Sequence, residues 1–328
     1  MIPIDVRFPS ARALLAGTLL LPRGAGPFPA AVLAAGSGHH DRDESVCGHA
    51  PLRAIAEHLA SFGIATLRFD GRGVGASGGE TEEAGFEMKV ADLLSASRHL
   101  ARDERIAANR IAFVGHSEGG LVAAAASRIH PAPVVMLAGP AIPISRMLHR
   151  QARALSVEAG ASEMQLRHEK RMNSRVFAEL RTRDPSPELR RDIRAIMAEA
   201  LRTWPEMDRE DEAQIDETAS RMADIVTAAD YHSLLRQRPA AILAAVTSPL
   251  LALFGEYDWQ VEAGPNRRAF DRTTTGNPHA SAQILARHNH LFQIADTGLS
   301  DEYGHLGPSP SLAALASLTE WLERRLMD

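Results

Sequence analysis

The fold of this sequence is decided by Gly115-His116-Ser117-Glu118-Gly119-Gly120. This segment follows the short apolar run Ile111 to Val114, which is typical of a buried strand, and precedes an alanine-rich run that favours a helix. A serine between two glycines, at a sharp turn from strand to helix, is the context of a nucleophile elbow. Only small residues two positions before and after the serine let strand and helix approach so closely. We therefore predict that Ser117 is a nucleophile; a glycine-rich turn without chemistry is the alternative.

Size and composition are those of an ordinary globular protein, with 328 residues, 45% hydrophobic and 23% charged. This length fits one large domain, or one domain that carries an insertion. The net charge is −5 and no block of a single sign occurs, so neither nucleic acid nor an anionic membrane is expected as a partner.

Three features of the sequence predict a cytoplasmic protein. The single cysteine, Cys47, excludes an internal disulfide and fits a reducing compartment. The first residues, from Met1 to Arg7, lack the basic region and apolar core of a signal peptide. No apolar run approaches the length that spans a bilayer. The sequence leaves the oligomeric state open, a homodimer included.

Short apolar runs alternate with segments of helical spacing along most of the chain. The runs that predict strands are residues 14–21, 30–35, 64–69, 111–114, 133–139, 250–255 and 282–286. The segments that predict helices run from Pro51 to Gly63, from Phe86 to Leu100, after Ser117, and from Ser309-Pro310 through Leu326. This alternation predicts the α/β class, with a mostly parallel central sheet flanked by helices.

The alternation stops after Pro140. Residues 144–237 show no convincing strand pattern, only charged helical segments with breaks. Ser186 before Pro187 predicts a helix N-cap with proline in the first turn, and Trp204-Pro205 predicts the end of that helix. We therefore predict a core domain of residues 1–142 and 241–328, with an all-helical cap (lid) of residues 143–240 inserted before the late strands.

A nucleophilic serine needs a base within reach, and the base needs an acceptor that orients it. In a doubly wound sheet such groups lie in loops at the carboxyl ends of the strands. The loop after the second-last predicted strand offers Asp258, with Glu256 as competitor. The loop after the last one offers His290, with His288 as competitor. We predict Asp258 as the acid and His290 as the base.

A metal site is the competing interpretation of these histidines. His288 and His290 are close in the sequence, and so are His39, His40 and Asp41. Neither group is joined by a further ligand at recognisable zinc or iron spacing. No metal ion and no other cofactor is therefore expected.

The oxyanion of a tetrahedral intermediate needs two backbone donors. One is predicted to be the N–H of Glu118, directly after the nucleophile. The other is predicted to be the N–H of Ser37, in the glycine-rich turn Gly36-Ser37-Gly38 after an early strand; a turn without chemistry is the alternative. The turn is not a phosphate loop, because neither it nor residues 71–75 completes a P-loop lysine signature.

Five ordered motifs make this sequence similar to the α/β-hydrolase superfamily, and more narrowly to the EstD-type serine esterases. Those esterases carry GSG-x-x-DRDE, R-x-D-x-RG-x-G-x-S, GHSEGG, GE-x-D-x-QV and NHLFQ. The same motifs occur here at residues 36–44, 68–77, 115–120, 255–261 and 289–293. The resemblance covers the chain outside the insertion. It implies an α/β-hydrolase fold, a triad of Ser117, Asp258 and His290, and hydrolysis of carboxylic esters through an acyl-enzyme; it also favours His290 over His288.

Charged residues next to the glycine-rich turn are candidates for a supporting role. We expect Asp41, Arg42, Asp43 and Glu44 to form ion pairs with one another or with Arg72. Such pairs would keep the turn rigid.

Candidates for contact with the substrate occur in two places. His39 and His40 are nearer the expected catalytic face. In the insertion, Arg146 and Arg150 share a helical face at four-residue spacing, and Met147 lies on another face. A solvated face and packing within the lid are the plainer interpretations; the sharper one is that the arginines attract an acidic substrate.

These patterns predict a serine hydrolase that cleaves small to medium carboxylic esters by a Ser-His-Asp acyl-enzyme mechanism. Its expected partner is a small-molecule ester. Thioester, amide or peptide, lactone and carbamate hydrolysis stay as alternatives on the same triad, because specificity lies in the pocket and the lid. A hydrolase-fold scaffold that binds a ligand without chemistry is the non-enzyme alternative.

Overall fold

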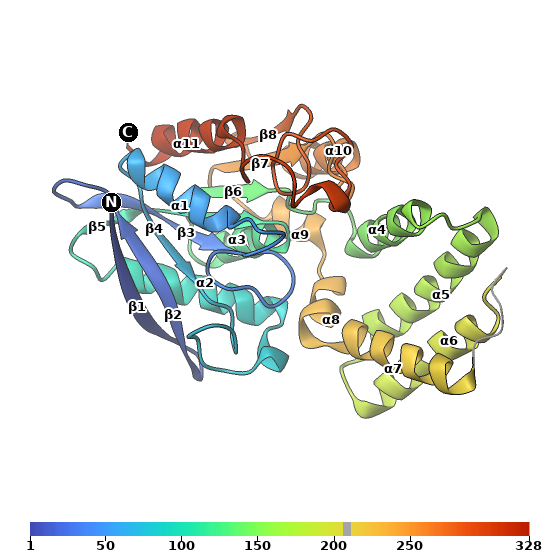
Figure 1. Ribbon diagram of the computed structural model, residues 1–328. Helices are drawn as coiled ribbons and strands as arrows, with labels where there is room; N and C mark the ends of the chain where they lie inside the picture. Colours follow the sequence, from blue (N-terminus) through green and yellow to red (C-terminus); the bar gives the residue numbers. More distant parts are fainter. Residues whose placement is uncertain (206–210, 328) are drawn as a thin grey trace. The chain divides into compact units, whose positions relative to one another are not determined.

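The computed structural model describes residues 1–205 and 211–327 and contains two compact units (Figure 1). The first unit comprises Met1–Ile142 and Arg238–Asp328, and the second comprises Pro143–Gln237. The second unit therefore ends at residue 237 rather than at the predicted 240. The reason is helix α9 (Pro239–Ala244), which starts inside the predicted insertion and packs against helices of the first unit.

An eight-stranded sheet in the order β1-β2-β4-β3-β5-β6-β7-β8 forms the centre of the first unit. Its strands are β1 (Ile2–Ser10), β2 (Ala13–Leu21), β3 (Phe28–Ala34), β4 (Ala65–Phe69), β5 (Ile106–His116), β6 (Val134–Leu137), β7 (Leu250–Gly255) and β8 (Ala280–Leu285). The strands from β4 to β8 run parallel, whereas β2 is antiparallel to both of its neighbours. The predicted α/β class with a mostly parallel sheet is confirmed.

Strand β1 is a difference from the sequence-based expectation, which begins the sheet at residue 14. It lies at the edge of the sheet and pairs only with β2. Its first six side chains are exposed or half-buried, and it contains Pro3 and Pro9. An edge strand tolerates proline and charge because half of its N–H groups face away from the ladder. Because of these features the strand is not a continuous apolar run, and the sequence pattern does not predict it.

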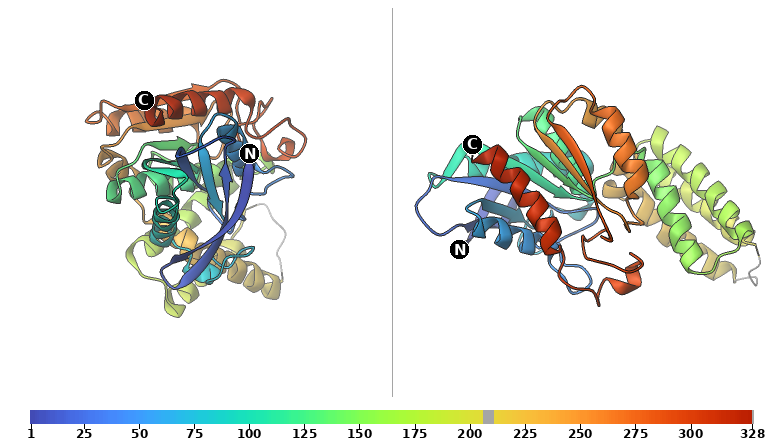
Figure 2. Two further views of the ribbon diagram at one scale, coloured as in Figure 1. Left: turned by 90° about the vertical axis from the view of Figure 1, so that its left-hand side faces the viewer. Right: turned by 90° about the horizontal axis from the view of Figure 1, so that it is seen from above.

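Helices cover both faces of the sheet (Figure 2). The helices of the first unit are α1 (Pro51–Ser61), α2 (Phe86–Leu100), α3 (Glu118–Ile129), α9, α10 (Ala263–Thr273) and α11 (Leu312–Leu326), with short 3₁₀ helices at Thr81–Glu83 and Ser300–Glu302. Helices α1 and α11 pack together on one face, where their apolar side chains join those of the central strands in one core. Helices α2, α3 and α9 pack side by side as the second layer, which α10 continues.

Helix α11 starts later than the predicted Ser309-Pro310. Its first residue is Leu312, and the Ser311 hydroxyl accepts a hydrogen bond from the Ala314 N–H at 3.2 Å, which makes Ser311 the N-cap. The Ser309 hydroxyl instead donates to the Leu291 carbonyl at 2.8 Å. Ser309 therefore belongs to the loop that holds residue 291, not to the helix.

The second unit contains five helices among its described residues, 143–205 and 211–237. They are α4 (Ile144–Glu158), α5 (Glu163–Thr182), α6 (Pro187–Arg202), α7 (Glu212–Thr227) and α8 (Ala229–Leu235). The predicted N-cap is present, because the Ser186 hydroxyl accepts from the Leu189 N–H at 3.1 Å with Pro187 in the first turn. Helix α6 ends at Arg202, just before the predicted Trp204-Pro205.

Many arginines of the second unit pair with acids on the next helix. Arg175 of α5 contacts Glu199 of α6 at 2.9 Å, and Arg194 of α6 contacts Asp216 of α7 at 2.9 Å. Exposed pairs of this kind contribute only about 0–1 kcal/mol each to stability. They account for the arginine-rich composition of the insertion as a solvated surface.

Residues 1–205 and 211–327 contain neither a membrane-spanning helix nor a cluster of metal-binding side chains. None of the helices there combines the length and apolar character needed to cross a membrane. No cluster of three or more histidine, cysteine, aspartate or glutamate side chains is arranged there to hold a metal ion.

Candidate active site

Ser117 occupies the sharp turn between strand β5 and helix α3. Its φ is 53° and its ψ is −122°, a conformation that residues other than glycine rarely adopt. The Ser117 N–H donates to the Leu137 carbonyl of β6 at 2.8 Å, which fixes the turn to the sheet. Helix α3 begins at Glu118, so the positive end of its dipole lies beside the serine.

Two glycines make this turn sterically feasible. A Cβ on Gly115 would lie 2.0 Å from the Gly119 carbonyl oxygen. A Cβ on Gly119 would lie 2.4 Å from the carbonyl oxygens of both Ala34 and Ala35. Both separations are far below van der Waals contact, so strands β3 and β5 and helix α3 approach one another only with hydrogen at these positions. The steric requirement expected from the sequence is therefore present.

Asp258 and His290 form a buried pair at the ends of two neighbouring strands. Nδ1 of His290 lies 2.8 Å from Oδ2 of Asp258, and the side chains are 6% and 0% exposed. The other carboxylate oxygen accepts from the N–H groups of Gln260 and Val261, both at 2.8 Å. Because Nδ1 faces a carboxylate, it carries the proton of the neutral ring and leaves Nε2 as an acceptor. This is the arrangement of an oriented base.

The two competitors have other partners. Glu256 is exposed and accepts from the Arg287 N–H at 2.8 Å. His288 lies with its Nδ1 2.8 Å from the Ala286 carbonyl and its Nε2 2.7 Å from the Ser311 hydroxyl, the N-cap of α11. The Glu256 contact joins the two late loops, and the partners of Glu256 and His288 leave Asp258 and His290 as the buried carboxylate–imidazole pair of these loops.

His116, the residue before Ser117, was missed by sequence reasoning. Its Nδ1 lies 2.8 Å from Oε1 of Glu44, and its Nε2 lies 3.0 Å from the main-chain carbonyl oxygen of His290. Both partners are acceptors, so both ring nitrogens must carry a proton, and the ring is an imidazolium. The rings of His116 and His290 are 4.8 Å apart between centroids. A titratable residue directly before a nucleophile is the signal that could have found it.

The ion pair of Glu44 and His116 shifts the pKa values of both side chains. Burial alone would lower the pKa of His116, but the charge and hydrogen bond of Glu44 outweigh burial and raise that pKa above its ordinary value. Burial alone would raise the pKa of Glu44, but the charge and hydrogen bond of His116 outweigh burial and lower it. Both directions favour the charged pair.

The glycine-rich turn lies against Ser117. The Gly36 N–H donates to the same Glu44 oxygen at 2.7 Å, and a Cβ on Gly36 would lie 3.2 Å from the Cβ of Ser117. The His40 ring contacts the Ser37 carbonyl at 2.8 Å through Nε2. Glu44 and His40 thus fix the turn from its two sides. His40 supports the turn that contains Ser37.

The charged residues after the turn are paired, but not with Arg72. Arg42 donates to both carboxylate oxygens of Asp70, at 3.0 and 2.7 Å. Asp43 accepts from Arg68 at 2.5 Å and also pairs with Arg53. The expectation that these residues pair with one another or with Arg72 is wrong, because their ion-pair partners are other residues outside the segment.

Arg72 belongs to a different buried pair. It donates to both oxygens of Asp92 on α2, at 2.9 and 2.6 Å. The long side chain of Arg72 pairs with a buried carboxylate nearby in the fold, and nothing in the local sequence shows that this carboxylate is residue 92.

Lys89 on helix α2 reaches Glu118, the residue after Ser117. Its Nζ lies 2.7 Å from Oε2 of Glu118, whose side chain is 1% exposed. The pair provides the buried Glu118 carboxylate with an ammonium partner. Lys89 was missed because its position in an ordinary amphipathic helix carries no chemical signature.

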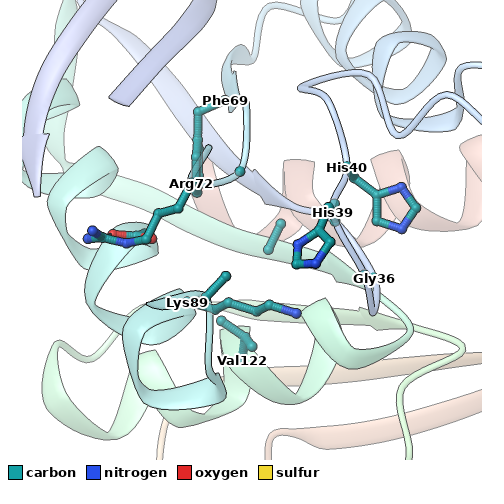
Figure 3. Close-up of a pocket in the computed structure, with 13 residues that line it drawn as sticks. Gly36, His39, His40, Phe69, Arg72, Lys89 and Val122 are labelled. Carbon is teal, nitrogen blue, oxygen red and sulfur yellow. The ribbon is translucent and has the colours of Figure 1, made fainter. Parts of the chain in front are cut away.

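A small cavity of about 60 Å³ opens beside the glycine-rich turn (Figure 3). Its lining comes from the first unit alone: Ala34, Ala35, Gly36, Gly38, His39, His40, Phe69, Gly71, Arg72, Ala84, Lys89, Asp92 and Val122. Figure 3 shows the His39 ring and the Lys89 amine extending toward the same space. Of the two histidines expected near the substrate, His39 has its ring turned to the cavity.

The remaining substrate-contact candidates lie on helix α4 of the second unit. Arg146 is exposed, Arg150 is half-buried and Met147 is buried. Their contact with substrate stays a prediction.

Residues 49–292 match the family described as serine aminopeptidase, S33. The chain is 28% identical over 280 residues to Esterase EstD of Thermotoga maritima, and the alignment covers 85% of this chain and 58% of that protein. This chain thus spans less than two thirds of the length of its curated relative.

Solved structures share the fold at low sequence identity. The α/β hydrolase GrgF of Penicillium sp. sh18 is 19% identical, with a TM-score of 0.59 over 100% of both chains. The Pf2001 esterase of Pyrococcus furiosus is 14% identical, with a TM-score of 0.58 over 99% of this chain and 91% of that one. These likenesses concern the arrangement of strands and helices.

Proposed function

This chain belongs to the serine aminopeptidase S33 family of α/β hydrolases, and from that premise we propose that it is a serine esterase acting on small carboxylic esters. The name of its relative, Esterase EstD, supports hydrolysis of an ester bond. The buried pair of His290 and Asp258 supports a base-activated nucleophile.

The proposed reaction begins at Ser117. His290 Nε2 takes the hydroxyl proton as Ser117 Oγ attacks the ester carbonyl carbon, and Asp258 stabilises the imidazolium that forms. The tetrahedral intermediate collapses when His290 returns the proton to the leaving alkoxide, which departs as the alcohol. A water molecule, deprotonated by His290, then attacks the acyl-enzyme; the bond between the acyl carbon and Ser117 Oγ breaks, His290 returns the proton to Oγ, and the acid leaves.

The negative oxygen of each tetrahedral intermediate is stabilised by two backbone N–H groups, those of Ser37 and Glu118. The close approach of Gly36 to Ser117 supports the role of the turn. The start of helix α3 at Glu118 supports the other donor, because the positive end of the helix dipole favours an anion there.

One observation carries the proposal above the others. Nδ1 of His290 lies 2.8 Å from the Asp258 carboxylate, whose side chain is 0% exposed. The main-chain carbonyl of His290 accepts a hydrogen bond from His116, the residue that precedes Ser117. Ligand binding without catalysis does not require a base that is oriented in this way, so this arrangement supports an enzyme over a binding scaffold.

Peptide-bond cleavage is the second candidate, because the family description names an aminopeptidase. A panel of nitrophenyl esters of graded chain length, run beside a thioester and aminoacyl anilides, separates the two. We expect kcat/KM to be highest for a short ester. A consistent preference for the anilides would replace the esterase with a peptidase, and a preference for the thioester would replace it with a thioesterase.

A further inference from the structure

The cavity beside the glycine-rich turn adjoins the proposed reaction centre. Gly36 lines it and also lies against the Cβ of Ser117. Lys89 lines it from helix α2 and is bonded to Glu118, the residue after Ser117. A substituent close to the ester group of a bound substrate therefore has this cavity within reach.

Hydrogen-bond donors are available in the cavity. The Lys89 ammonium has three N–H groups, and its hydrogen bond among the described residues is the one to Glu118. Two N–H groups remain for a ligand. Figure 3 shows the His39 ring reaching the same space from the turn after β3. The Glu118 contact fixes the ammonium in place, so little side-chain entropy is lost when a ligand binds.

The charges of the cavity wall are already balanced. The Lys89 ammonium faces the Glu118 carboxylate at 2.7 Å, and the Arg72 guanidinium faces the Asp92 carboxylate at 2.6 Å. An anionic ligand would add a negative charge to two neutralised pairs. A neutral oxygen accepts from Lys89 without adding any charge, so it loses less solvation on entering.

Apart from His40, the other side chains of the wall are apolar, and the space is small. Phe69, Ala34, Ala84 and Val122 contribute hydrocarbon surface. The cavity measures about 60 Å³, and one water needs about 10–15 Å³ on this scale. A chain of a few heavy atoms fits, and a long acyl chain does not.

We infer that this cavity is a specificity subsite that binds an uncharged oxygen, such as a keto, hydroxyl or ether oxygen, carried on a short chain next to the scissile ester. Lys89 donates the hydrogen bond and Glu118 holds Lys89 in position. The inference rests on the proposed esterase function, and it assigns the substrate class as short oxygenated esters.

The test compares esters that differ at one position. Nitrophenyl 4-oxopentanoate carries a keto oxygen, nitrophenyl pentanoate lacks it, and nitrophenyl hemisuccinate carries a carboxylate. A second pair places an ether oxygen in the alcohol part, as methoxyethyl and butyl acetate. A hydrogen bond from a charged donor predicts about a 10- to 100-fold preference in kcat/KM for the oxygenated member of one pair.

Lys89→Met should bring this ratio close to one. Because the ratio is internal to each variant, a general loss of activity cancels. The variant Lys89→Met/Glu118→Gln also removes the buried negative charge that Lys89→Met leaves without its ammonium partner, and it should show the same loss of preference. Lys170→Met, in the second unit, removes the same type of side chain elsewhere and should keep the wild-type ratio.

Measuring binding affinities distinguishes an error in the proposed subsite from an error in the proposed esterase function. Ser117→Ala is titrated calorimetrically with methyl 4-oxopentanoate and methyl pentanoate, and with methoxyethyl and butyl acetate. If wild type cleaves no ester but one oxygenated ligand binds about tenfold more tightly in a Lys89-dependent way, the esterase is refuted and the subsite stands. Equal rates and equal affinities within both pairs, a preference that survives in Lys89→Met, or a preference for the hemisuccinate would each overturn the subsite.

Discussion

Nε2 of His116 lies 3.0 Å from the main-chain oxygen of His290, although 174 positions separate the two residues in the chain. The other ring nitrogen lies 2.8 Å from Glu44, and the same Glu44 oxygen accepts from Gly36 at 2.7 Å. One buried ion pair thus joins the glycine-rich turn, the elbow and the histidine loop. His116, the residue before Ser117, thus connects the three parts of the candidate site.

Glu44→Gln should destabilise the protein in a pH-dependent way. Breaking a buried pair by removing one partner costs about 3–5 kcal/mol in the free energy of unfolding. The raised pKa of His116 contributes stability that is full below its ordinary value and is lost as pH rises through the raised pKa. The lowered pKa of Glu44 contributes stability that is full above its ordinary value and is lost as pH falls through the lowered pKa.

The stabilising effect of this pair is therefore largest between the ordinary pKa of a glutamate and the ordinary pKa of a histidine, and it declines as pH falls toward the lowered pKa of Glu44 or rises toward the raised pKa of His116. Urea unfolding of wild type and Glu44→Gln over a pH series measures it as a difference that shrinks at both ends. Glu57→Gln, on the exposed side of α1, is the matched control and should follow wild type. A Glu44→Gln curve parallel to wild type at every pH would contradict the imidazolium.

Asp258→Asn should reduce kcat on the order of 10³- to 10⁴-fold, because an amide favours the wrong histidine tautomer. KM should change far less, since Asp258 is buried behind His290. Glu256→Gln, in the same loop, should keep wild-type kcat because its side chain contacts the Arg287 N–H. Steady-state kinetics on one nitrophenyl ester decides between them, and a larger loss for Glu256→Gln would exchange their roles.

Gly119→Ala should destabilise the fold by at least about 1–3 kcal/mol, the usual cost of overpacking. The added methyl group would meet two carbonyl oxygens of the β3 loop at 2.4 Å. Gly276→Ala is the matched control, because its added methyl meets no atom within 4 Å, and its effect should stay within about 1 kcal/mol. Thermal and urea unfolding measure both; equal stability of the two variants would contradict the tight elbow.

The sequence predicted those parts of the protein that are encoded locally. The buried parallel strands are continuous apolar runs in the sequence. The elbow is recognisable from Gly115 and Gly119 on either side of Ser117. Strand β1 escaped because an exposed edge strand has no such run. The start of α11 was misplaced because Ser309 and Ser311 are equally good N-caps in the sequence, and only Ser311 bonds to the helix.

Contacts between distant residues could not be predicted. Glu44 contacts His116, which is 72 positions away in the chain. Arg72 pairs with Asp92 and not with the acids of residues 41–44. Lys89 reaches Glu118 from a helix whose spacing shows only that it is amphipathic. Such choices depend on which side chains the completed sheet brings together, and no local pattern in one sequence encodes them.

Labelling with a fluorophosphonate probe tests the central claim most directly, because the probe reacts with a serine only when a neighbouring base makes it nucleophilic. Intact-mass analysis should show one adduct per chain, and peptide mapping should locate it on Ser117. Ser117→Ala should take up no label, and His290→Ala should react far more slowly than wild type. A protein that hydrolyses esters while Ser117 stays unlabelled, or that labels equally well without His290, would contradict the account.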